Sequence, residues 1–215
     1  MNIHRALADV ASIRAQLERT EALRGFRSAA VGFSVVILII GYLVQRLLIV
    51  DANRSVEVYL GLWLVVALAS ATTAGIEMVV RGMRSEEPAV WNLHRQLAIR
   101  ILPSLLVGFV ITLMIGVQAW EARESPTVGM IWALPGIWSM IYGLGLLHCS
   151  RCLPRYSNGV ACYFLAAGAL VMVAAWLSGR QPAPWQMLAT FGVGQTGLAT
   201  VLYFNMDREL NRKDH

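Results

Sequence analysis

The chain has 215 residues, of which 57% are apolar and only 14% are Asp, Glu, Lys or Arg, and its formal net charge is +5. Because soluble domains carry about 25% charged residues, this composition excludes a disordered chain and a disulfide-stapled secreted domain, and it argues against a soluble enzyme. It predicts an integral membrane protein.

The first 27 residues form a mixed-charge arm with an apolar stripe. We expect this arm to be an amphipathic cytoplasmic helix that lies on the membrane or on the protein's own loops. The alternative is a homodimer or partner contact through Ile3, Val10, Ile13 and Leu17. An isolated coiled coil there would be marginal, because the stripe is short. Its residues recur in steps of three and four, as on one helix face: Ile3, Ala6, Val10, Ile13, Leu17 and Thr20.

Six long runs without a charged side chain follow the arm. Each reaches about 18 residues or more, enough for a helix that rises 1.5 Å per residue to cross a hydrocarbon core of about 30 Å. Barrel strands need only about 10 alternating residues. The sequence therefore predicts an all-α polytopic membrane protein with six transmembrane helices over residues 28–206 and a cytoplasmic tail over residues 207–215. The runs are Ser28 to Gln45, Val58 to Ile76, Ile101 to Trp120, Ser125 to Ser150, Tyr156 to Gly179 and Gln181 to Met206.

Lys and Arg indicate the orientation of the spans. Of the 18 basic residues, 14 fall in the arm, the second and fourth connections and the C-terminal tail. Cytoplasmic loops carry such an excess, so we expect both termini in the cytoplasm, in agreement with an even number of spans. The basic residues then face the anionic headgroups of the lipid bilayer, and no nucleic acid partner is expected.

The second connection, residues 77–100, is the only long loop between the predicted spans. Within it, Ser85-Glu86-Glu87-Pro88 predicts a helix start, because Ser caps the backbone, acids favour the first turn and Pro is tolerated there. We expect a helix that runs from this point into the third span, with a kink at Pro103.

Three polar residues are candidates for an intramembrane polar site. Glu77 lies close to hydrocarbon, which suggests a functional group, although an ion pair with Arg81 four residues later also explains it. Gln195 and Thr196 lie in the Gly-rich sixth run, where small residues let helices approach and amides bond across the interface. A ligand pocket around Gln195 is the alternative.

The segment from His148 to Cys152 has a Cys-x-x-Cys spacing with an adjacent His, which is typical of redox or metal sites. The predicted topology places His148, Cys149 and Cys152 on the cytoplasmic side, where thiols stay reduced. A structural zinc site also takes four ligands, and Cys162 is the only further cysteine. We therefore expect ordinary interfacial side chains, no cofactor and no bound metal.

Several segments together resemble a known family. They are the charged helix Ile13 to Thr20 before a Gly- and Ala-rich span, the basic loop and Trp-containing helix Arg81 to Arg100, the Tyr-Gly-Leu-Gly-Leu motif Tyr142 to Leu146, and the Phe-Gly-Val-Gly motif Phe191 to Gly194 before Tyr203. The chain resembles a family of uncharacterised bacterial six-helix inner-membrane proteins, which often accompany winged-helix regulators. The resemblance implies a sensing or envelope-response role. The chain departs from the family at Gln195, a position where a His is frequent. This difference weakens the expectation that the position binds a metal or transfers a proton.

The functional expectation follows from these points. No Walker loop, nucleophile elbow, zinc-protease motif or dinucleotide fingerprint occurs, so we expect no enzymatic activity. We expect a non-enzymatic sensory or interaction component that acts from the cytoplasmic face of a bacterial inner membrane. A small transporter or channel built around Glu77, Gln195 and Thr196 is the alternative.

Overall fold

The described part of the chain is entirely helical apart from short connecting turns. The computed structural model describes residues 28–48, 56–84, 88–121, 130–150, 153, 156–178 and 183–204, and no strand occurs among them. The predicted N-terminal helix, with Ile3, Val10, Ile13 and Leu17, and the tail over residues 207–215 lie outside the described residues. The elements are α2 (Ser28–Leu48), α3 (Val56–Arg84), α4 (Pro88–Glu121), η2 (Met130–Ala133), α5 (Leu134–His148), α6 (Ser157–Leu177), α7 (Pro184–Met187), η3 (Leu188–Gly192) and α8 (Val193–Leu202).

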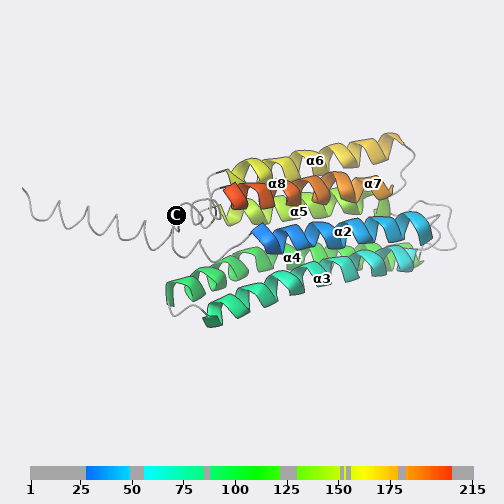
Figure 1. The fold of residues 1–215 in the computed structure, drawn as a ribbon. Helices are drawn as coiled ribbons and strands as arrows, with labels where there is room; N and C mark the ends of the chain where they lie inside the picture. The colour runs from blue at the N-terminus through cyan, green and yellow to red at the C-terminus, as the bar shows by residue number, and fades with distance from the viewer. Residues whose placement is uncertain are drawn as a thin grey trace, which may run out of the picture.

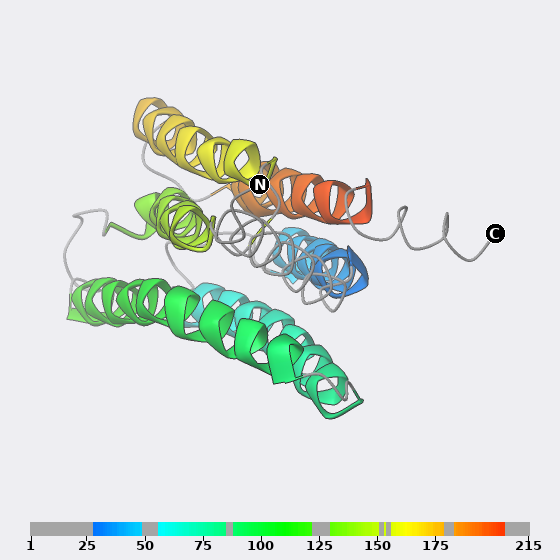
Figure 2. The same cartoon turned by 90° about the vertical axis from the view of Figure 1, so that its left-hand side faces the viewer.

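The long helices run alternately in opposite directions, so the start of α2 and the end of α8 lie at the same end of the bundle (Figure 1). Viewed along the bundle, α3 and α4 lie on one side, α2 and α5 in the middle, and α6 with α8 on the other side (Figure 2). The helix contacts agree: α3 packs against α2 and α4, while α8 packs against α2 and α6. This arrangement confirms the predicted all-α fold for the described residues.

Four of the described helices are long and apolar enough to cross a membrane. These spans are Glu57–Val80, Arg95–Gln118, Met130–His148 and Ser157–Leu177. In the first predicted span, helix α2 has 21 residues, and its part Val31–Leu47 is a shorter apolar helix. The sixth predicted run, which consists of α7, η3 and α8, is not among these four spans. A count of uncharged residues does not detect such a change of helix type.

The surface of the bundle is strongly apolar. On α4, large side chains such as Leu106, Phe109, Val110 and Met114 are exposed. A helix that is apolar on all sides is typical of a membrane span, because lipid tails solvate these side chains as well as a protein core does. The described surface is thus compatible with a membrane protein.

Within the predicted helix start, Pro88 is described as helical, whereas Ser85, Glu86 and Glu87 lie outside the described residues. Helix α4 begins at Pro88 and continues to Glu121, with Pro103 inside it. The helix is therefore continuous through Pro103, and the expected kink at this residue stays a prediction. At 1.5 Å per residue its 34 residues extend over about 51 Å, well beyond a hydrocarbon core of about 30 Å.

The tightest helix contact is between α5 and α6. A Cβ atom added to Gly136 would lie 2.6 Å from the carbonyl oxygen of Gly168, and one added to Gly143 would lie 3.0 Å from that of Ala161. Between these glycines, the Ser139 hydroxyl donates a hydrogen bond of 2.8 Å to the carbonyl oxygen of Phe164. Small residues therefore bring the two backbones close together, as is usual between membrane helices.

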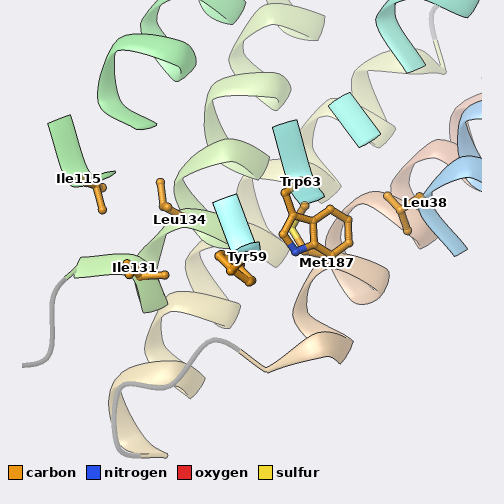
Figure 3. Close-up of a cluster of buried hydrophobic side chains, with 7 residues drawn as sticks. All are labelled: Leu38, Tyr59, Trp63, Ile115, Ile131, Leu134 and Met187. Atoms are coloured by element: carbon orange, nitrogen blue, oxygen red, sulfur yellow. The ribbon is translucent and has the colours of Figure 1, made fainter. Parts of the chain in front are cut away.

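One cluster of large apolar and aromatic side chains is buried between the helices. They come from α2, α3, α4, η2, α5 and α7, so this cluster holds both sides of the bundle together (Figure 3). Tyr59 and Trp63 are its largest fully buried members. The cluster consists of Leu38, Tyr59, Trp63, Ile115, Ile131, Leu134 and Met187.

Candidate functional site

Polar side chains inside the bundle form hydrogen bonds between helices. The Trp63 indole N–H on α3 donates to Gln45 Oε1 on α2 over 3.1 Å, and both side chains are buried. The Trp138 indole N–H on α5 donates to Thr112 Oγ1 on α4 over 2.8 Å. Buried polar groups in hydrocarbon need such partners, because no water reaches them. These two bonds join neighbouring helices.

A third interhelical bond joins α5 to α8. Gln195 Nε2 donates to the Tyr142 hydroxyl over 2.9 Å. The Tyr142 ring packs against Phe164, with ring centroids 4.9 Å apart, and against Phe191 at 5.7 Å. Phe164 and Phe191 also contact each other, at 5.6 Å. Side chains from α5, α6, η3 and α8 thus meet around one amide–phenol hydrogen bond. We define Tyr142, Phe164, Phe191 and Gln195 as the aromatic–amide cluster.

The sixth helix changes type next to this cluster. Residues Leu188–Gly192 form a π-helical turn, in which the backbone N–H of Val193 reaches the carbonyl oxygen of Leu188. The Tyr163 hydroxyl on α6 donates a hydrogen bond to the carbonyl oxygen of Ala189. Thr190 Oγ1, which is buried, donates to the carbonyl oxygen of Gln186 over 2.9 Å. Short π turns inside α-helices are frequent at functional sites, so the aromatic–amide cluster and this turn form the candidate site.

The structure does not bring the three predicted polar residues together. Gln195 belongs to the aromatic–amide cluster, as described. Thr196 is exposed, and its hydroxyl donates to the Gly192 carbonyl oxygen of its own helix over 2.7 Å. Glu77 is half-buried on α3, which packs against α2 and α4 rather than α8. Of the two hypotheses for Gln195, its bond to Tyr142 supports interhelical packing.

The His-Cys segment at the end of α5 is only partly described. Cys149 is buried beneath α4, with its Sγ 4.0 Å from the Leu97 carbonyl oxygen, and it packs near Met78 and Ile101. His148 is exposed, whereas Cys152 lies outside the described residues. Within the described ranges, no group of three His, Cys, Asp or Glu side chains is placed to hold a metal ion. Cys149 acts there as a small buried side chain at a helix contact.

Several residues that form interhelical hydrogen bonds were not predicted from the sequence. Gln45, Trp63 and Tyr163 each form interhelical hydrogen bonds, yet they lie in predicted spans as single polar or aromatic side chains. Gln45 could have been singled out, because it is an amide side chain within a charge-free run. Its partner was not recognisable, because Trp and Tyr are also common at membrane interfaces.

We expect the replacement Trp63→Phe to lower the free energy of unfolding by about 0.6–1.7 kcal/mol. The change removes the indole N–H and leaves the buried Gln45 Oε1 without this donor, and such interhelical bonds contribute about 0.6 and at most about 1.7 kcal/mol. Equilibrium unfolding in mixed micelles with a rising fraction of SDS measures the change. Trp185→Phe is the matched control, because Trp185 is exposed. An equal effect of the two replacements would contradict the prediction.

Comparison with known proteins gives no relative from which a function could be transferred. The chain matches no family model, no curated protein and no solved structure. The resemblance to uncharacterised inner-membrane proteins therefore stays a prediction from the sequence motifs.

Proposed function

We propose that this chain is a six-span protein of a bacterial inner membrane, with both termini in the cytoplasm, which acts without catalysis as a sensory or interaction component. The bias of Lys and Arg supports this orientation. The position of the start of α2 and the end of α8 at one end of the bundle is consistent with it (Figure 1).

Exposed aromatic residues support the fifth and sixth helices as full spans. Exposed Tyr156, the residue before α6, and exposed Trp176 on α6 are 20 residues apart, which is about 30 Å along a helix and equals the hydrocarbon thickness. Along α7, η3 and α8, exposed Trp185 and Tyr203 are 18 residues apart, or about 27 Å. Trp and Tyr are enriched at the two membrane interfaces, so these pairs fit the two edges of one bilayer.

The hydrogen bonds that the interior polar groups form between helices are the observation that carries the non-catalytic proposal. Gln45 accepts from Trp63, Thr112 accepts from Trp138, and Gln195 donates to Tyr142. Each pair joins two helices, and the pairs come from different parts of the bundle. A transport or catalytic site instead needs several polar groups that converge on one ligand. These pairs therefore support a structural role for the interior polar groups. We place the interaction surface on the cytoplasmic segments.

The apolar stripe of the N-terminal arm provides the test. Replacing Val10, Ile13 and Leu17 with Ser should leave the spans inserted, because insertion depends on their own hydrophobicity. It should remove at least about 90% of a partner or second copy captured with the tagged protein from native membranes, since burying each such side chain contributes about 1.5–3 kcal/mol. Quantitative affinity capture, with mass spectrometry of the eluate, measures this loss.

The matched control replaces Ala8, Ala11 and Ala15 with Ser, because these residues lie off the stripe and the new side chains are the same. This control variant should retain the captured proteins. If both triple variants capture the same proteins in the same amounts as the unaltered chain, the stripe only covers the membrane surface and the proposal loses its support.

A further inference from the structure

Helix α6 begins at the edge of a candidate membrane span. The span Ser157–Leu177 starts with the first residue of the helix. This start lies at the same end of the bundle as the end of α8 (Figure 1). In a bilayer the first turn of α6 therefore lies next to the headgroup region, where lipid phosphates are concentrated.

The backbone of this first turn has donors that the helix itself does not use. The first N–H groups of an α-helix have no carbonyl partner within it. In α6 the Gly159 N–H bonds the Tyr156 carbonyl oxygen over 3.1 Å, but the N–H groups of Ser157 and Asn158 come too early for such a bond. Tyr156 occupies the N-cap position, and its side chain makes no capping hydrogen bond.

The Ser157 hydroxyl is a further donor at the same place. The Ser157 side chain is 2% exposed, and its Oγ has no hydrogen-bond partner among the described residues. A buried polar group in this state is costly and points to a missing partner such as an ion. Because the Cα–Cβ bond of a helical residue tilts toward the helix N-terminus, this hydroxyl is directed to the same end as the backbone N–H groups.

The charge and the shape of the turn favour an anion. The first turn of α6 contains no acidic residue, and Arg151 and Arg155 shortly precede it in the sequence. Asn158 and Gly159 are exposed, and no atom lies within 4 Å of a Cβ added to Gly159. An anion can therefore approach the turn from the side of these two residues.

We propose that the first turn of α6 binds a phosphate group, which accepts hydrogen bonds from the Ser157 hydroxyl and from the backbone N–H groups of Ser157 and Asn158. Helix N-termini suit such anions, because the N–H groups and the helix dipole both favour negative charge. The phosphate group belongs to a phospholipid headgroup or to a free phosphate ion. This site is separate from the N-terminal arm, so it goes beyond the proposed function and does not depend on it.

Native mass spectrometry of the full chain in a non-ionic detergent, with added phosphatidylglycerol, tests this proposal. The phospholipid should bind the unaltered chain, whereas a diacylglycerol with the same acyl chains but no phosphate should not. Millimolar inorganic phosphate then identifies the source of the phosphate group. Displacement of the phospholipid assigns the site to the free ion, and retention assigns it to the headgroup.

Two variants connect the binding to the first turn of α6. Ser157→Ala should lower the affinity for phosphatidylglycerol about tenfold, the usual effect of one lost hydrogen bond to a charged acceptor. Because this hydroxyl has no partner in the lipid-free protein, the variant should unfold at the same temperature as the unaltered chain without lipid. Asn158→Asp should lower the affinity by at least about tenfold through charge repulsion, although an acid in the first turn favours the helix itself.

Gln96→Glu is the matched control, because it adds the same charge at an exposed position on α4, on the other side of the bundle from α6 (Figure 2). This variant should retain the affinity of the unaltered chain. The proposal is overturned if the unaltered chain does not bind the phospholipid, if diacylglycerol binds equally well, if either α6 variant retains full affinity, or if Gln96→Glu loses as much as Asn158→Asp. A lower unfolding temperature of lipid-free Ser157→Ala would also overturn it, because the hydroxyl would then have a partner within the protein.

Discussion

Replacing Gly168 with Ala is expected to lower the free energy of unfolding by about 1–3 kcal/mol, the usual effect of overpacking a tight contact. The new Cβ atom would lie 2.7 Å from the Gly136 carbonyl oxygen and 3.2 Å from the Met140 backbone nitrogen. Backbone atoms cannot turn aside as the end of a side chain can, so α5 and α6 must separate. Their separation would also lengthen the bond from Ser139 to the Phe164 carbonyl oxygen.

Gly159→Ala on the same helix is the matched control, because no atom lies within 4 Å of a Cβ added there. This replacement should be neutral or stabilise the protein by up to about 1 kcal/mol, since Ala is the better helix former. Unfolding in mixed micelles measures both variants. Equal stabilities for the two would mean that α5 and α6 are not in backbone contact.

The helical architecture was largely predictable from the sequence, because the length that a span needs can be judged for each segment separately. A helix of about 20 apolar residues satisfies all its backbone groups without a neighbour, so charge-free runs sufficed to predict an all-helical chain. The start of α4 at Pro88 was also predictable, because capping and first-turn preferences involve only adjacent residues. The described residues confirm helices in all six runs, and four of these meet the length and composition of a span.

The candidate site was less predictable because it depends on which helices are neighbours. Gln195 was identified, but its partner Tyr142 lies 53 residues earlier on a helix whose rotation the sequence leaves undetermined. Glu77 was grouped with Gln195 by chemical type alone, whereas α3 and α8 lie on different sides of the bundle (Figure 2). The π turn accepts a hydrogen bond from Tyr163 on another helix, a contact that no local pattern in the sixth run indicates.

The Phe164→Ala replacement should have the largest effect on stability among single changes in the aromatic–amide cluster, with a loss of about 3 kcal/mol. Phe164 is fully buried, and its ring contacts Tyr142, Tyr163 and Phe191. Large-to-small changes of this kind cost about 3–5 kcal/mol in water-soluble cores. The effect here lies at the lower end, because lipid solvates the exposed ring in the unfolded state and only the packing contributes.

The replacement should also change the contact between α6 and α8. Without the ring, Gly194 loses the surface against which it packs, so the contact between α6 and α8 weakens. Phe33→Ala is the matched control, because the Phe33 side chain is 61% exposed on α2 and faces the surroundings of the bundle. Unfolding in mixed micelles should give a loss of less than about 0.5 kcal/mol for this control. Equal losses for Phe33→Ala and Phe164→Ala would show that the aromatic–amide cluster contributes no packing between α5, α6 and the sixth helix.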